Sequence, residues 1–292
     1  MAQSNEIKVL LSVDGDELNP GEVARRSGLT PERMWRKGDA RSTFSTLKQT
    51  THGMDVYSGL PESSRFEEHL VALLARLEPA ASYLRELIAT KSILVWVDIY
   101  EIETGIPRFS LSREQVAAVA SLGADLDFDI YYWAEDAEER NLAVGIDRRN
   151  LKHAYLTVAM PDVELIAFLG RTGLGAETAR YVPGGDREIA GCVWIDSGCG
   201  DGEDLDEQLQ ALLLKVAPAT QALAEFGGKK EVRFQAEVYE YIPAAYVGRP
   251  GMQGIAGLGA GLTIEISYFG ESARVDRDAP SEGPATATDP PK

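Results

Sequence analysis

Residues 66–87 read FEEHLVALLARLEPAASYLREL, and residues 205–226 read LDEQLQALLLKVAPATQALAEF. Within both stretches the apolar residues recur at alternating intervals of four and three, which places them in one stripe along a helix. Each stretch also has a proline at the same point, Pro79 and Pro218. Because proline inside a helix removes a backbone hydrogen bond and clashes with the preceding turn, both helices are predicted to kink or break there.

The sequences that follow these two helices repeat as well. Residues 93–99 align with residues 232–238 at the same offset of 139, and in both stretches every second residue is apolar, as in a strand with one buried face. Residues 123–130 align with residues 259–266 at an offset of 136, and both place a glycine before an alternating strand. Matches that keep one order along the chain indicate an internal duplication.

Each copy reads as strand, short helix, hairpin, long helix, strand, helix and strand. This order predicts an α+β fold with two tandem copies of a sheet-plus-helices module, the sheets mixed or mostly antiparallel and the helices on one face. We assign residues 1–135 to the first copy, 136–150 to a charged linker and 151–270 to a second, divergent copy. Residues 271–292 are rich in Pro, Ser, Ala and Asp, and we expect them to be a disordered tail.

The two copies differ at two places. The run from Gly254 to Gly261 is rich in glycine, which disfavours a helix, so we expect a flexible loop where the first copy has a helix over residues 113–122. On the face of the sheet opposite the helices, the first copy carries Leu94 and Trp96 where the second has charged and polar residues. We expect the other copy to cover this apolar surface through intramolecular pairing of the two copies.

The charge of the chain excludes several classes of partner. Lys plus Arg number 29 and Asp plus Glu number 46, so the formal net charge is −17. Nucleic acids and anionic membranes bind basic surfaces, so we expect neither as a partner. An acidic protein attracts a basic protein partner through complementary fields. Because the sequence begins without a signal-like segment and has no apolar stretch long enough to span a bilayer, we expect a cytoplasmic protein.

Cysteine and histidine give little support for a metal or for catalysis. Cys192 and Cys199 flank a predicted strand end, and in the cytoplasm a reduced pair is favoured over a disulfide. His52, His69 and His153 do not combine with them at the spacing of a zinc module. The histidines also lack an evident serine or cysteine partner for nucleophilic catalysis. We therefore predict no catalytic residue, no metal and no cofactor.

The segment over residues 35–39 is the most site-like loop. Trp35, Arg36, Lys37 and Asp39 bring an aromatic face, two cations and a carboxylate into five residues. Loops held by a scaffold often carry function, and tryptophan and arginine are favoured anchors of protein interfaces. The structural alternative is that Trp35 closes the end of the core while Asp39 caps a turn.

A second candidate is the acidic strand over residues 125–129. Asp125, Asp127 and Asp129 alternate and share one face, and Asp98 and Trp96 belong to the strand predicted beside it. Clustered carboxylates suit a divalent metal, an acid–base pair or a basic protein partner. The alternative is a solvated strand face. The candidate binding residues are therefore Trp35, Arg36, Lys37, Asp39, Trp96, Asp127 and Asp129.

Three segments of the first copy carry a family resemblance: DELNPGEV over residues 16–23, GLTP over 28–31 and WRKGD over 35–39. Together they resemble the bacterial domain of unknown function family 4279, over residues 5–133 and more weakly over residues 152–269. The second copy has YVPGGD in place of the tryptophan motif, so an activity tied to that motif would reside in the first copy. The resemblance implies no established chemistry, but some members look like neighbours of toxin and immunity genes.

Two functions of different classes follow. The favoured one is a non-catalytic protein-binding module, in one form an immunity-type inhibitor of a basic toxin. The alternative is a small-molecule- or metal-binding enzyme that uses the loop from Trp35 to Asp39 of the first copy. A structural domain pair with neither role is the third.

Overall fold

The computed structural model describes residues 6–41, 47–101, 108–132, 151–159, 179–182, 192–199, 204–238 and 245–268. The first half contains β1 (Glu6–Gly15), α1 (Pro20–Ser27), β2 (Arg33–Trp35), β3 (His52–Tyr57), α2 (Phe66–Leu77), α3 (Ala81–Leu87), β4 (Ser92–Glu101), β5 (Phe109–Leu111), α4 (Arg113–Leu122) and β6 (Asp125–Tyr132). The second half contains β7 (Leu151–Ala159), β8 (Ala179–Val182), β9 (Cys192–Asp196), α6 (Leu205–Val216), α7 (Thr220–Glu225), β10 (Lys229–Val238), β11 (Ala245–Val247), α8 (Arg249–Gly257) and β12 (Gly261–Tyr268). The predicted α+β class, with mostly antiparallel sheets, is confirmed.

Both long amphipathic helices break at their prolines, as predicted. A 3-10 turn over Glu78–Ala80 separates α2 from α3, and a 3-10 turn over Ala217–Ala219 separates α6 from α7. Apolar residues of the stripe are buried on both sides of each break, for example Leu77 and Leu84, although the last residue of each stripe, Leu87 or Phe226, is only partly buried. The break therefore lets the chain change direction while one apolar face stays on the core.

The strands form two six-stranded sheets. In each sheet one edge strand comes from the other half of the chain. The first sheet has the order β11-β6-β4-β1-β3-β2, and the second has the order β5-β12-β10-β7-β9-β8. Thus β5 lies between β4 and α4 in the sequence but pairs with β12, and β11 of the second half pairs with β6. The pairs β4–β6 and β10–β12 are parallel, and the other pairs are antiparallel. Without the exchanged strands, the two sheets have the same order of corresponding strands.

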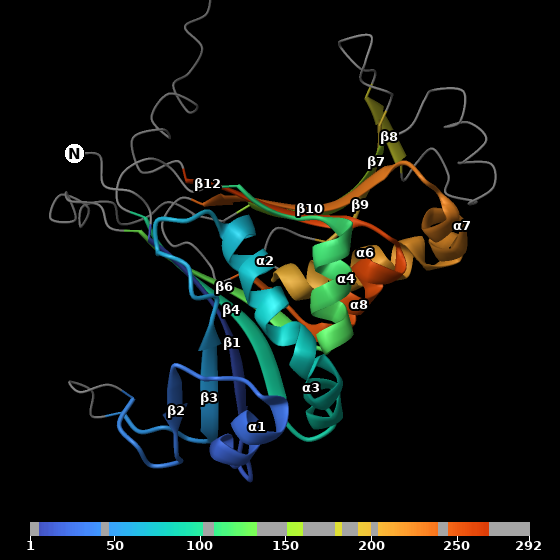
Figure 1. The fold of residues 1–292 in the computed structure, drawn as a ribbon. Coiled ribbons are helices and arrows are strands. Elements are labelled where there is room, and N and C mark those ends of the chain that lie inside the picture. The colour runs from blue at the N-terminus through green and yellow to red at the C-terminus, as the bar shows by residue number, and fades with distance from the viewer. Residues whose placement is uncertain are drawn as a thin grey trace, which may run out of the picture.

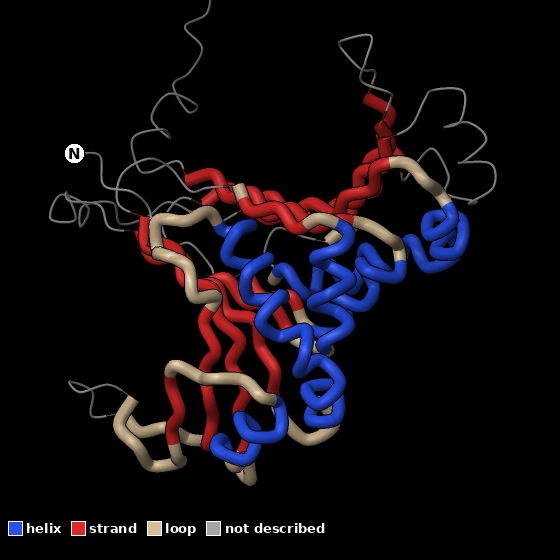
Figure 2. Tube along the Cα trace, viewed as in Figure 1, coloured by secondary structure: helices blue, strands red, loops and turns tan. Residues whose placement is uncertain are grey.

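The two sheets form the sides of an angle, and helices of both halves lie inside it (Figures 1 and 2). In this layer α4 packs against α8, and α6 packs against β7 of its own sheet. The buried apolar side chains of both halves form one continuous core. At its centre the rings of Phe66, Phe109 and Phe128 lie 5.4–5.6 Å apart, centroid to centroid. The two halves therefore share a single hydrophobic core.

The expectation of a flexible loop over Gly254–Gly261 is wrong, because α8 is a helix through Gly257. A Cβ added at Gly251 would lie 2.6 Å from Leu209 Cδ2, and one at Gly254 would lie 2.4 Å from Leu213 Cδ1. Both leucines belong to α6. The glycines thus allow close packing of α8 on α6, and that packing outweighs their low helix propensity.

Within the described residues, the second half contacts the first sheet along its β6 edge and on its helix side, and the expected cover of its outer face stays a prediction. Among the described residues the halves meet through α4, α8 and the exchanged strands β5 and β11. The outer face of the first sheet is turned away from these helices (Figure 1). The predicted linker over residues 136–150, the short helix predicted over 163–169 and the tail over 271–292 lie outside the described residues. None of the described helices combines the length and the apolar character that crossing a membrane requires.

Candidate functional site

The outer face of the first sheet carries the candidate binding residues of β4 and β6. Because side chains alternate along a strand, the residues that point away from the helices form rows across the sheet. Trp96 lies between Leu10 and Asp127 in one row, and Asp98 lies between Lys8 and Asp129 in the next. We call this surface the acidic face and define it by Lys8, Leu10, Ser12, Asp14, Asp55, Tyr57, Leu94, Trp96, Asp98, Asp127 and Asp129.

Two carboxyl groups of the acidic face are poorly stabilised as anions. Burial and the nearby charge of Asp129 raise the pKa of Asp98 to about 6. The same two causes raise the pKa of Asp127 to about 6. Neither Asp98 nor Asp127 makes an ion pair within the described ranges, and Asp127 Oδ1 is buried there without a hydrogen bond. A cation placed beside these groups would therefore favour their ionised forms.

A second pair of carboxyl groups lies on the next two strands of the sheet, Asp14 on β1 and Asp55 on β3. Burial raises the pKa of Asp55 against the opposing effects of a hydrogen bond from Ser12 and the charge of Arg33. Arg33 Nη1 is 3.8 Å from Asp55 Oδ2, and the guanidinium also stacks over the Trp35 ring at 5.2 Å. Burial likewise raises the pKa of Asp14. Arg33 of the same chain thus partly neutralises the charge of this part of the acidic face.

Apolar and aromatic groups lie between the acids. Leu10 is buried, and Trp96 and Tyr57 are half-buried beside it in the same row. The Trp96 Nε1 atom makes no hydrogen bond of regular geometry with the described residues, although it lies close enough to Asp98 to lower the pKa of that carboxyl. Aromatic side chains such as Trp96 and Tyr57 are enriched at protein interfaces, where the ring packs and the polar tip finds a partner.

The outer face of the second sheet differs because, among the residues described on it, the charges neutralise one another. Glu231 accepts a hydrogen bond of 2.5 Å from Thr263 Oγ1 and lies 2.8 Å from Arg233 Nη2. Although burial acts to raise it, these two contacts hold the pKa of Glu231 below its usual value. Arg108, just before β5, lies 3.1 Å from Glu265 of β12. The ion pair of Arg108 with Glu265 connects the start of β5 to the second sheet. Acids that are already paired are less available to bind a cation of a partner.

The segment from Trp35 to Asp39 lies at the β2 edge of the first sheet, apart from Asp127 and Asp129. Trp35 is the last residue of β2 and packs on Gly53, where a Cβ would lie 2.2 Å from the indole ring. Asp39 Oδ2 accepts a hydrogen bond of 2.7 Å from the Arg36 backbone N–H, which closes the turn. Lys37 pairs with Asp16 at 2.8 Å. Lys37 and Asp39 thus serve local structure, the Arg36 side chain is exposed, and Trp35 faces the side of the sheet that carries the acidic face.

A polar pair that we did not predict lies in the core. Ser58 Oγ is 2.5 Å from His69 Nδ1, and the two residues are 6 % and 1 % exposed. Burial lowers the pKa of His69. The position of His69 corresponds to Gln208 in the second half, which is also buried and accepts a hydrogen bond of 2.7 Å from the Ala154 N–H. The alignment of His69 with a glutamine at the same helix position could have indicated this structural role.

The serine–histidine pair is closed off from substrate, and nucleophilic catalysis needs an accessible nucleophile. Within the described ranges no group of three or more His, Cys, Asp or Glu side chains is placed to hold a metal ion. The acidic face itself presents carboxylates, aromatic rings and an unused donor on a rigid sheet.

Residues 5–133 match the family described as a domain of unknown function, DUF4279. The match covers the first half of the chain from β1 to β6, in agreement with the resemblance found there in the sequence. No curated protein and no solved structure matches the chain.

Proposed function

We propose that this chain is a non-catalytic protein-binding module whose acidic face receives a basic segment of a partner protein. The supporting observation is the pair Asp98 and Asp127, two half-buried carboxyls with pKa values of about 6 and no ion pair within the described ranges. The charge of Lys8, opposite Asp98, acts to lower the pKa of Asp98, but its ammonium is paired with Glu62. A lysine or arginine of a partner would offset the cost of ionising both groups. The net charge of −17 would speed the encounter with such a partner.

The organisation and biological role belong to the same proposal. We propose that the second half is a divergent copy of the first, supported by the matching strand order of the two sheets. An immunity-type inhibitor of a basic toxin, acting in the cytoplasm, is the form of binding module that fits an acidic recognition face best. The alternative of an enzyme built on the segment from Trp35 to Asp39 has less support, because Lys37 and Asp39 already serve local contacts.

The test compares wild type with the double variant Asp98→Asn/Asp127→Asn. Proteins captured from the native host by the full chain are identified, purified and titrated calorimetrically against both forms. We expect a basic partner whose affinity falls at least about tenfold in the variant, which corresponds to ~1.4 kcal/mol. We also expect binding to wild type to strengthen from pH 5 to pH 7, because the partner prefers carboxyls that ionise near pH 6.

The matched control is Glu86→Gln/Glu225→Gln, which removes the same charge from exposed positions on α3 and α7. This control should lower affinity only slightly and only at low salt, where long-range fields act. Equal binding by wild type and the Asp98/Asp127 variant would refute the proposal. So would the absence of any partner that survives purification at low and at moderate salt.

A further inference from the structure

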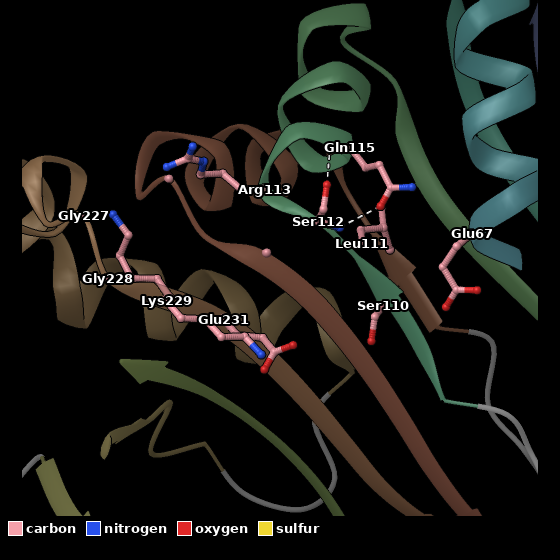
Figure 3. Close-up of a pocket in the computed structure, with 13 residues that line it drawn as sticks. Glu67, Ser110, Leu111, Ser112, Arg113, Gln115, Gly227, Gly228, Lys229 and Glu231 are labelled. Atoms are coloured by element: carbon pink, nitrogen blue, oxygen red, sulfur yellow. Dashed lines mark hydrogen bonds between the residues drawn. The ribbon is translucent and has the colours of Figure 1, made fainter. Parts of the chain in front are cut away.

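A cavity of 610 Å³ opens where the exchanged strand β5 meets the second half. From the first half it is lined by Glu67 and by residues 110–113 and Gln115, at the end of β5 and the first turn of α4. From the second half it is lined by residues 227–231 and by Gly259 and Gly261 (Figure 3). Its volume lies in the range of small-molecule sites. Neither half alone would form this cavity, because each contributes one side.

The cavity contains a buried cation with which no described residue forms an ion pair. Lys230 is 5 % exposed and lines the cavity. Its ammonium donates one hydrogen bond, to the Leu223 carbonyl oxygen in the last turn of α7, and makes no ion pair within the described part of the chain. An ammonium has three N–H donors, so this contact leaves donors unused. Buried charges in proteins are normally paired, and an unpaired one suggests that its partner is a ligand.

A second cation lies beside the first. Arg113 also lines the cavity, and its charge acts together with burial to lower the pKa of Lys230. A Cβ added at Gly259 would lie 3.3 Å from Lys230 Nζ and 3.8 Å from Arg113 Cδ, so this glycine keeps open the space next to both side chains. Arg113 pairs with Glu114 at 3.2 Å, but both side chains of that pair are exposed, and exposed pairs are weak.

The acids of the lining do not neutralise these cations. Glu231 is already engaged by Thr263 and Arg233. Glu67 belongs to α2 and lies on the side of the cavity away from Gly227 and Gly228 in Figure 3. The site is therefore locally cationic in a chain whose net charge is strongly negative.

The corresponding place in the other half holds its own anions. There α8 begins at Arg249, whose backbone N–H lies 2.6 Å from Asp125 Oδ1, and the Gly248 N–H lies 2.8 Å from Asp206 Oδ1. Asp125 is the first residue of β6, and the first residue of β12 is Gly261, which has no side chain. Beside α4 the chain thus has no carboxylate at the position that Asp125 takes beside α8, and a Cβ at Gly261 would lie only 2.8 Å from the Leu111 carbonyl oxygen.

We propose that this cavity binds a small molecule through a phosphate group held by Lys230 and Arg113. A phosphate carries close to two negative charges at neutral pH, which matches two cations better than a carboxylate does. Arginine adds planar, directional donors, and lysine adds a point charge. The remaining volume accommodates the organic part of a phosphate monoester.

The test titrates the full chain with inorganic phosphate and with ribose 5-phosphate by calorimetry and thermal shift, at about 0.15 M salt so that the long-range repulsion is screened. We expect saturable binding and a rise in melting temperature that sodium chloride does not reproduce. Tighter binding of ribose 5-phosphate would identify a phosphate monoester as the ligand, and equal binding would identify free phosphate.

Variants locate the binding. Arg113→Gln changes a side chain that is 61 % exposed, so the fold should persist while affinity for phosphate falls at least about tenfold. Lys230→Met should abolish binding if it folds. The matched control is Lys215→Met, whose ammonium also donates to a backbone carbonyl, that of Asp196, but does not line the cavity. No saturable binding up to about 10 mM, or equal binding by wild type and Arg113→Gln, would overturn the proposal.

Discussion

At the scale of single residues, two ionised carboxylates of the acidic face, Asp98 and Asp127, destabilise the folded state. Asp98 and Asp127 have pKa values of about 6 in the fold, whereas an aspartate in an unfolded chain has a pKa of about 3.9. The folded state therefore binds protons more tightly than the unfolded state at these two positions. The free energy of unfolding must fall as the pH rises from about 4 to about 6 through this contribution. Groups with pKa values shifted in this way are often found at functional sites.

Replacing either group by asparagine should remove this cost. We expect Asp98→Asn and Asp127→Asn each to raise the free energy of unfolding at pH 7 by up to about 1 kcal/mol, after discounting for solvent screening of half-exposed groups. At pH 4 the gain should largely vanish, because the group is then protonated in the folded state and about half protonated in the unfolded state. Urea unfolding at the two pH values measures the difference. A variant that is less stable than wild type at pH 7 would contradict this account.

His69 has the opposite pH dependence. Burial lowers its pKa in the fold, so the unfolded state, with a pKa near 6.5, binds the proton more tightly. The contribution of His69 to stability is therefore complete above about pH 6.5 and is lost as the pH falls toward its folded pKa.

We expect His69→Gln to be tolerated because the second half has Gln208 at this position, whereas His69→Ala should cost about 1–3 kcal/mol by leaving Ser58 buried without its partner. The stability difference between wild type and His69→Gln should shrink or reverse between pH 7 and pH 5. Denaturant unfolding at both pH values checks this, and a difference that stays constant with pH would exclude a buried neutral histidine.

At the scale of secondary-structure elements, glycine has different roles at different positions of α8. Gly251 faces Leu209 of α6, with 2.6 Å between its ideal Cβ and Leu209 Cδ2. Gly257 has no neighbouring atom within 4 Å of such a Cβ and does not have a positive φ. One glycine therefore permits a close helix–helix contact, whereas the other only lowers helix propensity.

The pair Gly251→Ala and Gly257→Ala separates these roles. We expect Gly251→Ala to lower the free energy of unfolding by about 1–3 kcal/mol because the added methyl group overpacks the contact with α6. Gly257→Ala should raise it by up to about 1 kcal/mol through helix propensity. Thermal and urea unfolding of both variants provide the measurement. Stabilisation by both substitutions would mean that α8 does not pack closely on α6.

The elements that sequence reasoning predicted are those with long, regular patterns. The stripe through Leu70 to Leu84 and the prolines at 79 and 218 predicted both helices and their interruptions, because packing follows the stripe and proline acts locally. The strands β5 and β11 have three residues each, too few to show a period or to identify a distant partner. The glycines of α8 misled the prediction because their contacts with α6 are not local.

The candidate site was predicted in part for the same reason. Alternation placed Asp127 and Asp129 on one face, and the parallel pairing of β4 with β6 brought Trp96 and Asp98 beside them. Trp35 faces the same side of the sheet, but Asp39 closes its own turn and Lys37 pairs with Asp16. A loop sequence does not reveal such partners. The Ser58–His69 contact depends on a turn geometry that no periodicity encodes.

At the scale of the whole molecule, the exchanged strands make the two halves mutually dependent. The ring of Phe109 in β5 packs against Phe66 and Phe128 of the first half, while the backbone of β5 pairs with β12 of the second. Stability is therefore not the sum of two independent modules. A substitution in β5 should therefore lower the stability of both sheets.

We expect the chain to unfold in a single cooperative transition, and Phe109→Ala to lower the free energy of unfolding by about 3–5 kcal/mol without splitting that transition. Near-ultraviolet circular dichroism and tryptophan fluorescence, followed together with calorimetry, provide the test. Two separated transitions in wild type, or a variant in which only one half melts early, would show that the halves fold independently.

The reciprocal placement of β5 and β11 has a practical consequence. If the peptide bond were cut between β6 and β7, each piece would retain a strand that completes the sheet of the other. Such pieces, produced separately, would each expose an unfilled sheet edge and part of a divided core. Mixing them should restore the native fold, so this protein is suited to use as a split pair whose reassembly reports the proximity of two fused proteins.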